Sequence, residues 1–346
     1  MPAAEAEAAK PLADDEIHDL LDPYLQRPAL LLAVSGGPDS LGMLAAFARW
    51  RERVPAVPAL HVATVDHGLR PESASECAMV EQAATRVGLP SRTLRWQGDK
   101  PATGLQEAAR EARYRLLGAH AQALGATSVV LAHHQDDQAE TVIMRLVRGS
   151  GPLGLKGMAA VSERDGVQLL RPFLFVPKAR LAATAAAAGL APVEDPSNRD
   201  PRFTRTRIRR VMQVLAEEGL DAERVAILAG RMQMLDAAGA QHAARLAEET
   251  SLDAPPGVRM FDGSGWLEAP FADMMRLLAD ALAEVGDPTI DARLEAQEEL
   301  AGEVLMAVAR GEPLRRNLQG ALISVTAAGR VIVAREPPRQ SGRNPD

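Results

Sequence analysis

The chain has 346 residues, 47% hydrophobic and 25% charged, which is ordinary for a globular protein and long enough for two domains. Its one cysteine, Cys77, excludes a disulfide framework and a Cys-x-x-Cys zinc or redox site, and we expect it to be a buried small apolar residue. The net charge of −7 argues against general nucleic-acid binding, but residues 199–210 hold six arginines and one aspartate, a concentrated basic patch that suggests a local polyanion contact.

The first 28 residues are expected to form a flexible N-terminal segment with a short helix over residues 15–24. They contain no basic stretch followed by an apolar core, so they do not resemble a secretory signal. The longest tempting uncharged run, residues 181–193, has 13 residues and contains a proline, which is too short and interrupted to cross a bilayer. We therefore expect a cytoplasmic protein that does not contact membranes.

The stretch from residue 29 to residue 40 predicts a buried strand, a tight glycine loop and a helix. Six apolar residues end at Ser35-Gly-Gly-Pro-Asp-Ser40, and an apolar stripe with helical spacing follows. Gly36 and Gly37 would let the backbone approach an anion at the helix start, and Asp39 beside phosphates makes sense if it holds a divalent cation. No Walker A lysine follows. The alternative, a glycine turn that only caps the helix, would not require the aspartate.

The second and third predicted strands, residues 59–65 and 91–96, flank a predicted helix over residues 73–87. Asp66 and His67 follow the second strand, and ligands of open α/β sheets bind beyond the carboxyl ends of strands. These two residues could contact a ribose or a base, although a lone histidine is more often structural. Next comes a helix over residues 104–124, where Arg110 and Arg113 are either phosphate ligands or solvated charges.

A dense polar cluster follows the fourth predicted strand, residues 128–132. If a helix begins near Gln135, the carboxylates of Asp136, Asp137 and Glu140 gather over its first turn. Acidic residues also stabilise a helix N-terminus, which is the plainer explanation, but two histidines and three acids exceed what capping requires. A metal site that includes His133 and Asp136 is conceivable, whereas the zinc-hydrolase pattern His-Glu-x-x-His is absent.

The next segments are a glycine-rich run over residues 148–157, expected to be a mobile loop, a strand over residues 169–175 and a helix over residues 177–188. An arginine-rich helix follows, in which Arg202, Arg205 and Arg209 are expected to share the outward face. Such a run is usually a solvated face, yet arginine without lysine favours bidentate partners such as phosphate or carboxylate.

Beyond residue 217 the sequence predicts three amphipathic helices, over residues 222–247, 270–285 and 291–309, with a strand over residues 258–261 and a terminal hairpin of residues 321–325 and 330–334. The expected fold is α/β, a doubly wound and mostly parallel sheet over residues 29–216, with a mainly helical C-terminal domain over residues 217–336. Residues 337–346 are expected to be a disordered tail.

Several blocks together resemble one known family. They cover most of residues 29–215 and read SGGPDS (35–40), VDHGLRPES (65–73), EAAREARY (107–114), HHQDDQAETVIMRLVRGSG (133–151) and EDPSNRDPRFTRTRIR (194–209). In this combination and order they resemble the bacterial tRNA(Ile)-lysidine synthetases, which belong to the N-type ATP pyrophosphatase, or PP-loop, superfamily. The resemblance implies an adenine nucleotide alpha hydrolase-like catalytic domain and a C-terminal domain that contacts tRNA.

The resemblance also implies a reaction. ATP adenylates the C2 carbonyl oxygen of the wobble cytidine of a tRNA(Ile) with the anticodon CAU and releases pyrophosphate. The ε-amine of free lysine then attacks C2 and releases AMP, which leaves lysidine and changes codon recognition from AUG to AUA. The implied substrates and cofactor are ATP, tRNA(Ile), free L-lysine and Mg²⁺, and the resemblance leaves a homodimer open.

Roles carry over from the family to matching positions. The ATP-binding residues would be Ser35, Gly36, Gly37, Pro38, Asp39, Ser40, Asp66, His67 and Arg113. Asp39 and Asp136 would hold Mg²⁺. The lysine-binding residues would be Asp137, Glu140, Arg205 and Arg207. The tRNA-binding residues would be Arg199, Arg202, Arg205 and Arg209. The catalytic set would be Asp39, His133, Asp136 and Asp137.

The second step needs a base. A free lysine amine has a pKa of ~10.4, so only a few molecules in ~10⁴ are unprotonated at neutral pH. His133, Asp137 or Glu140 could accept the proton, and the sequence does not choose among them. Two positions depart from the family pattern, since Ala132 replaces a usual glycine and Thr206 replaces a usual asparagine.

Other functions of this fold require features that the sequence lacks. A tRNA thiolase would need cysteines for sulfur transfer, and GMP or asparagine synthetases carry or recruit a glutaminase. A non-catalytic RNA-binding protein would keep the arginines of residues 199–210 but would have no use for Asp39, Asp136, Asp137 and Glu140 together.

Overall fold

The computed structural model describes residues 10–98, 100–101, 103–193, 204–287, 289–290 and 292–337. The chain divides into two compact units: unit 1 comprises residues 1–149 and 154–230, and unit 2 comprises residues 150–153 and 231–346. Helix α10 (Ala222–Thr250) supplies residues to both units. The division between the units falls inside this helix, after residue 230. The expected domain ranges, 29–216 and 217–336, stay a prediction. The expected tail lies outside the described residues except for residue 337.

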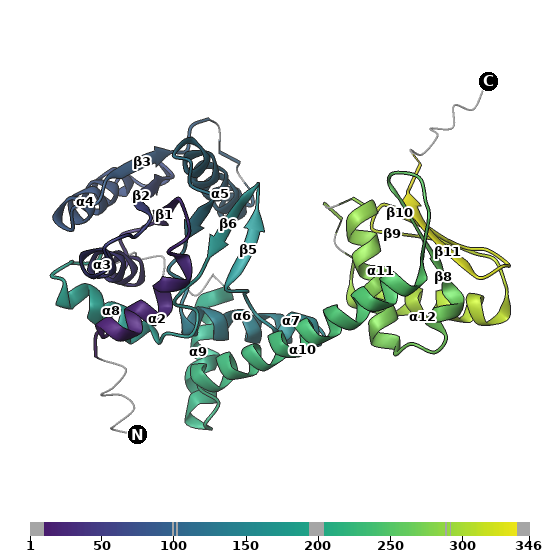
Figure 1. The fold of residues 1–346 in the computed structure, drawn as a ribbon. Helices are drawn as coiled ribbons and strands as arrows, with labels where there is room; N and C mark the ends of the chain where they lie inside the picture. Colours follow the sequence, from purple (N-terminus) through teal and green to yellow (C-terminus); the bar gives the residue numbers. More distant parts are fainter. Residues whose placement is uncertain are drawn as a thin grey trace. The chain divides into compact units, whose positions relative to one another are not determined.

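Unit 1 is built on a six-stranded sheet with the order β3-β2-β1-β4-β6-β5 (Figure 1). The strands are β1 (Ala29–Ala33), β2 (Ala59–Asp66), β3 (Ser91–Arg95), β4 (Ser128–Val130), β5 (Val161–Arg164) and β6 (Val167–Leu170). All neighbours pair in parallel except β5 and β6. This confirms the doubly wound α/β sheet, whose strand order reverses between β1 and β4, where such folds bind ligands.

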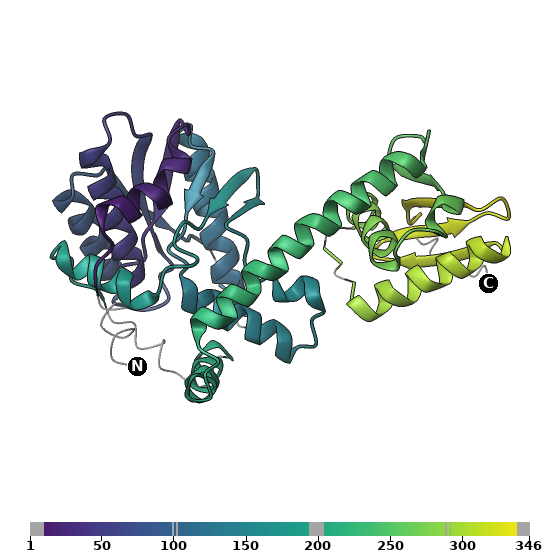
Figure 2. The ribbon, with the colours of Figure 1, turned by 60° about the horizontal axis from the view of Figure 1, so that its bottom comes forward.

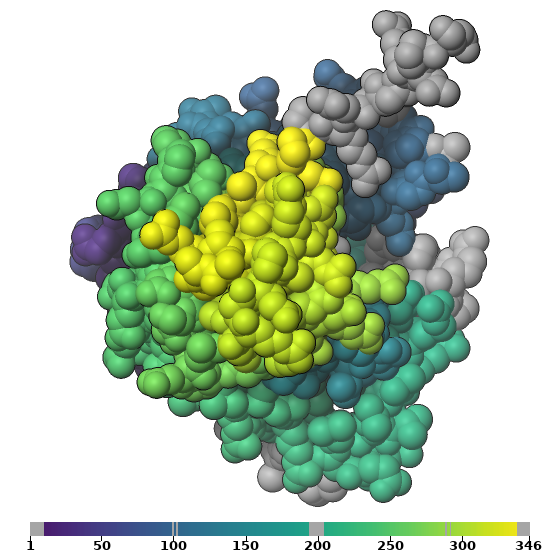
Figure 3. Space-filling model, turned by 90° about the vertical axis from the view of Figure 1, so that its right-hand side faces the viewer, coloured from purple at the N-terminus to yellow at the C-terminus, as the bar shows by residue number. Residues whose placement is uncertain are grey.

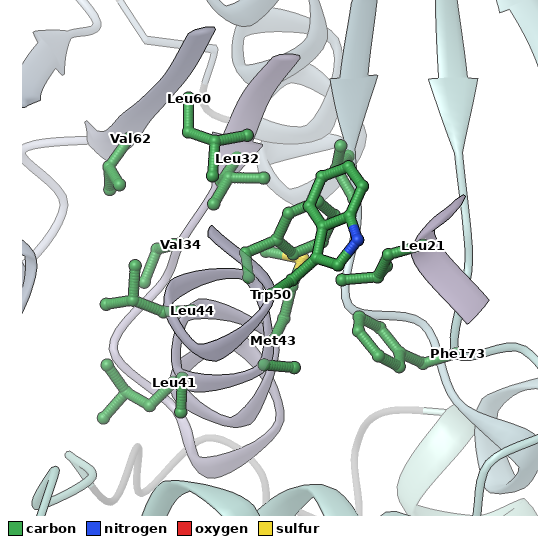
Figure 4. Packing of buried hydrophobic residues seen from close by; sticks show 14 of the residues in the cluster. Leu21, Leu32, Val34, Leu41, Met43, Leu44, Trp50, Leu60, Val62 and Phe173 are labelled. Carbon is green, nitrogen blue, oxygen red and sulfur yellow. The ribbon is translucent and has the colours of Figure 1, made fainter. Parts of the chain in front are cut away.

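Helices cover both faces of this sheet because β1 is apolar on both sides. Leu30 and Leu32 pack with α2 (Asp14–Leu21), α3 (Pro38–Arg53), α4 (Ser73–Arg86) and α8 (Lys178–Ala187), whereas Ala29 and Leu31 pack with α5 (Leu105–Ala123). Figure 4 shows Trp50 and Met43 of α3 at the centre of the first cluster. The alternation fixes the strand register and therefore the position of the loop after β1.

Helices α3 and α8 lie side by side at an unusually close crossing (Figures 1 and 2). A Cβ atom on Gly42 would lie 2.2 Å from the backbone oxygen of Leu181, so only glycine fits at this point. The crossing holds the start of α3, and with it Asp39, beside the sheet.

The helix expected over residues 15–24 is confirmed as α2 and the short 3₁₀ helix η1 (Asp22–Tyr24), and Leu12, Ile17 and Leu21 are buried in the core beside α3. The expected flexibility of residues 1–28 stays a prediction. One expectation about unit 1 is wrong. The strand expected over residues 169–175 ends at Leu170, since Phe173 fills the same core from a turn (Figure 4). Apolar residues alone could not distinguish a strand from a buried turn.

The glycine-rich run of residues 148–157, expected to be mobile, contains the single-turn helix α7 (Pro152–Leu155) and is bonded to α6 (Gln135–Val147). The guanidinium of Arg145 donates to the backbone oxygens of Gly154 and Gly157. Next to it, the buried amide of Gln138 both donates to and accepts from the backbone of Met158. Helix α6 also packs against α9 (Thr204–Glu217) and the start of α10.

Unit 2 contains the end of α10, the helices α11 and α12, and a five-stranded antiparallel sheet with the order β7-β8-β11-β10-β9 (Figure 1). Figure 3 shows part of the surface of these residues, in green to yellow. Its elements are β7 (Ser251–Leu252), β8 (Val258–Asp262), η3 (Gly263–Trp266), α11 (Phe271–Val285), α12 (Leu294–Arg310), β9 (Leu314–Leu318), β10 (Ala321–Val325) and β11 (Arg330–Arg335). The expected terminal hairpin is confirmed by the pairing of β10 with β11. Across the described residues, every helix is too short or too polar to traverse a bilayer.

Candidate active site

The loop after β1 turns sharply into α3. Gly36 has φ +87°, a conformation that favours glycine, and its backbone oxygen accepts a hydrogen bond from the amide of Val193 at 2.9 Å. Gly37 is the N-cap of α3 and Pro38 is its first residue, which leaves the helix start open toward a ligand. Ser40 is buried and used within the loop, because its Oγ accepts from the amide of Ser35 and donates to the oxygen of Gly37.

The segment after β4 meets this loop, since β1 and β4 are neighbouring parallel strands. Helix α6 begins at Gln135, as predicted, and His134 is its N-cap. The Nε2 atom of His134 lies 3.4 Å from the carboxylate of Asp39 and 3.3 Å from that of Asp137, and its Nδ1 atom lies 3.6 Å from the carboxylate of Asp136. Three expected catalytic carboxylates therefore surround one imidazole.

This environment changes the proton affinity of His134. Burial disfavours the charged imidazole, but the hydrogen bond to Asp39 and the charges of Asp137, Asp39 and Asp136 outweigh it, so the pKa of His134 is raised above 6.5. The sequence analysis assigned His134 no role. One feature of the sequence could have singled it out: His134 directly precedes the helix that begins at Gln135, and histidine rarely fills such an N-cap position.

Asp39 and Asp136, the residues expected to hold Mg²⁺, can be tested against that ion. The Oδ1 atom of Asp39 is buried and has no hydrogen-bond partner among the described residues, whereas Oδ2 of Asp136 accepts the amide of Lys178 at 3.1 Å. In the same residues, no three His, Cys, Asp or Glu side chains enclose a common metal position. Mg²⁺ needs only one or two carboxylates when phosphates and water complete its coordination. The unpaired oxygen of Asp39 and the all-oxygen donors fit a nucleotide-bound Mg²⁺.

His133 lies in a basic environment. Burial lowers its pKa well below 6.5, and the nearby charges of Arg171, Arg113, Arg205 and Arg110 act in the same direction. Its Nδ1 atom is buried without a partner in the described part of the chain. The side chain is therefore neutral at physiological pH and retains a free nitrogen.

Arg113 lies near both His133 and His67, the residue that follows β2. Its positive charge also contributes, after burial, to a lowered pKa of His67. Its Nε atom is buried and unpaired within the described ranges, and its guanidinium stacks 5.1 Å from the ring centre of Tyr114. Arg113 is thus not a solvated charge, whereas Arg110 also stacks on this ring from an exposed position.

The carboxyl end of β2 is partly occupied by local contacts. Asp66 accepts the amide of Gly68 at 2.8 Å. His67 packs edge to face against Trp96, with 6.1 Å between the ring centres, and Lys100 lies over the same indole. The Nδ1 atom of His67 is buried and has no hydrogen-bond partner in the residues described. Asp66 is thus the last residue of β2 and His67 follows it, at the edge of the sheet where ligands of such folds bind.

Glu140 lies on the buried side of α6 and is paired with α9. Its Oε1 atom accepts the Nε–H of Arg209 at 2.5 Å, and Arg205 lies 3.8 Å from Oε2. The expected outward orientation is therefore wrong for Arg209, because a buried carboxylate requires a nearby cation. Burial raises the pKa of Glu140, although the bond to Arg209 opposes that change.

The remaining expected residues are less closely placed. Arg207 donates to the hydroxyl of Thr204 at 3.2 Å, and Thr206, one of the two departures, is buried in α9. Ala132 is partly buried at the end of the segment after β4. Arg199 and Arg202 lie outside the described residues, so their expected tRNA contacts have no structural description.

Comparisons with known proteins agree with this geometry. The family described as PP-loop domain matches residues 9–215. A protein of Methylobacterium sp. (strain 4-46) named tRNA(Ile)-lysidine synthase is 48% identical over 97% of this chain and 98% of its own. One of Methylobacterium nodulans with the same name is 49% identical over 97% and 99%. Among solved structures, a U34-tRNA thiolase of Methanococcus maripaludis shares 16% identity at a TM-score of 0.54, over 64% of this chain and 78% of that chain, which reflects the fold alone.

Proposed function

This chain belongs to the tRNA(Ile)-lysidine synthase family, and we propose that it joins free lysine to C2 of the wobble cytidine in tRNA(Ile) with a CAU anticodon, at the cost of ATP. The product is lysidine, with AMP and pyrophosphate released. The observation that carries the proposal is the meeting of Asp39, Asp136 and Asp137 around His134, where the loop after β1 reaches the start of α6.

In the first step, the loop of residues 35–40 and the start of α3 bind the phosphates of ATP. The turn at Gly36 and the helix N-terminus support this role, because both favour an anion. Asp39 and Asp136 would hold Mg²⁺, which neutralises charge as the bond between the α and β phosphates breaks. Arg113 adds positive charge beside His67 and His133, and Asp66 with His67 would contact the nucleoside.

In the second step, the lysine amine must lose a proton before it attacks C2 of the adenylated cytidine. We propose His133 as the base, because its buried Nδ1 atom has no partner in the described part of the chain and is free to accept a proton. Glu140 is less suitable, since Arg209 holds its carboxylate. Asp137 and Glu140 would instead recognise the ammonium group of lysine, and Arg205 and Arg207 its carboxylate.

The tRNA contact is proposed for Arg199, Arg202 and Arg205, with unit 2 as a further contact. Arginine forms bidentate contacts with phosphate, which supports this assignment. Arg209 is the weakest member of the expected set, because its guanidinium is committed to Glu140. A cytoplasmic location and a homodimer remain part of the proposal.

The test is mass analysis of tRNA(Ile) after incubation with ATP, Mg²⁺ and lysine. The tRNA should gain the mass of one lysine less one water, and pyrophosphate release should depend on a cytidine at position 34. Without lysine, adenylated tRNA should accumulate and AMP should not appear. A matched tRNA with uridine at position 34 should stay unchanged.

Two outcomes would contradict the proposal. Pyrophosphate release without tRNA would indicate a different acceptor, and transfer of sulfur would indicate a thiolase. The second outcome is disfavoured by composition, because the chain has a single cysteine, Cys77, which is buried.

A further inference from the structure

His134 is almost completely buried, with a relative exposure of 2%, at the point where two helices begin. Its ring lies between Asp39 on α3 and Asp136 and Asp137 on α6. These carboxylates follow two neighbouring parallel strands, β1 and β4. The imidazole therefore joins the loop of residues 35–40 to the carboxylates of Asp136 and Asp137 at the start of α6.

The hydrogen bonds of His134 fix its orientation. Its Nδ1 atom accepts the amide of Asp137 at 3.3 Å, and the carboxylate of Asp137 accepts the amide of His134 at 3.3 Å in return, which is a reciprocal cap of α6. Because Nδ1 is an acceptor, the ring proton lies on Nε2, which faces Asp39 at 3.4 Å and Asp137 at 3.3 Å. The cap thus directs the Nε2 donor toward the carboxylates of both residues, and Asp39 is the one that comes from the other strand end.

Asp39 is held through only one of its two oxygens. The Oδ2 atom lies next to His134, whereas Oδ1 is buried without a partner among the residues that the structure describes. A buried unpaired carboxylate oxygen is costly unless a ligand satisfies it. The contact with His134 therefore leaves Asp39 with one oxygen fixed and one available.

We propose that His134 is a positioning residue that holds Asp39 through Oδ2 and so keeps Oδ1 directed at the cation of bound ATP. This inference rests on the proposed function only in that ATP binds with Mg²⁺ at this loop. Helix capping alone does not explain a histidine here, since serine, threonine, aspartate and asparagine are the preferred caps and are too short to reach Asp39.

The two roles of His134 can be separated by His134→Asn. An asparagine oxygen can accept the amide of Asp137 and keep the cap, but the side chain has no atom in the place of Nε2. His134→Ala removes both roles. His242→Asn, at an exposed histidine of α10, is the matched control.

The measurement is calorimetric titration of each variant with ATP over a series of Mg²⁺ concentrations, without tRNA or lysine, together with thermal unfolding. We expect His134→Asn to melt close to the unsubstituted protein and to need roughly tenfold more Mg²⁺ for the same ATP affinity, the loss typical of one hydrogen bond to a charged group. His134→Ala should show the same Mg²⁺ shift and a lower melting temperature. His242→Asn should show neither.

An unchanged Mg²⁺ requirement in His134→Asn would overturn the inference and leave His134 as a helix cap. The experiment detects nucleotide binding only, so it remains decisive if the unsubstituted protein binds ATP with Mg²⁺ but forms no lysidine. A protein that binds ATP without any dependence on Mg²⁺ would overturn both the inference and the proposed metal ligands.

Discussion

Glu140 and Arg209 form an ion pair between α6 and α9, in which Oε1 and Nε are 2.5 Å apart. The carboxylate belongs to a residue with 3% exposure, while the arginine side chain is 36% exposed. Arg205 is a second, more distant cation at 3.8 Å. The pair anchors α9 beside the start of α6. Arg209, which the sequence analysis assigned to tRNA binding, therefore also has a structural role.

Removal of this arginine should destabilise the protein. We expect Arg209→Gln to lower the free energy of unfolding by roughly 1–3 kcal/mol, because Glu140 would lose its nearest cation, although partial solvent exposure and Arg205 limit the loss. Urea unfolding measures this effect. In Arg209→Gln combined with Glu140→Gln, most of the loss should be recovered.

The same variant tests the tRNA role of Arg209. The salt dependence of tRNA binding should be unchanged, since the guanidinium is already occupied by Glu140. A slope that falls by ~0.7–0.9 would show that Arg209 contacts a phosphate after all. Arg202→Ala, for which a phosphate contact is proposed, is the comparison that should show this fall.

Substitution of Asp39 should separate chemistry from folding. Asp39→Ala should abolish pyrophosphate release with tRNA and ATP while the melting temperature stays near that of the unsubstituted protein, because Asp39 is exposed in part and contributes no apolar packing. Asp253→Ala, at an exposed aspartate of unit 2, is the control. Retained adenylation would remove Asp39 from the proposed metal site.

His133 should act after adenylation. We expect His133→Gln to form adenylated tRNA normally but to slow the transfer to lysine by roughly 10²–10⁴-fold, the range typical of a lost general base. Separate quantification of pyrophosphate and AMP distinguishes the two steps. Equal slowing of both would assign His133 to nucleotide binding instead.

The N-terminal helix should make a pH-dependent contribution to stability. The bond from Arg180 to Glu16 lowers the pKa of that carboxyl from 4.5 to about 2. A lowered folded-state pKa stabilises the fold above pH 4.5, and the contribution is lost as the pH falls toward 2.

Because the Glu16 side chain is 39% exposed, solvent limits this contribution to about 1 kcal/mol or less. Glu16→Gln should therefore lower the melting temperature slightly at neutral pH and not at all near pH 2. Asp19→Asn, at an exposed position of the same helix, should change it at neither pH. A constant difference between Glu16→Gln and the unsubstituted protein across this range would exclude the ion pair as its cause.

Local patterns predicted much of the sheet and most helices. The apolar run of β1 and the helical spacing after Gln135 depend only on neighbouring residues, so the sequence placed both elements correctly. Two hairpins were missed although each has a readable turn. Asp165-Gly166 and Gln319-Gly320 have positive φ angles and join β5 to β6 and β9 to β10. The first strand of each hairpin, β5 or β9, is short and largely polar, which hides the strand pattern.

The sequence by itself determined the family, the doubly wound α/β fold class and the types of residue at the site, because these follow from contiguous motifs and local periodicity. Only the tertiary structure decided which of those residues touch. The pairing of Glu140 with Arg209 joins residues 69 positions apart, and the contact of His134 with Asp39 joins residues from two different strand ends. Such contacts depend on how the helices pack on the sheet. A charge that becomes buried in this packing needs an oppositely charged or hydrogen-bonding partner nearby.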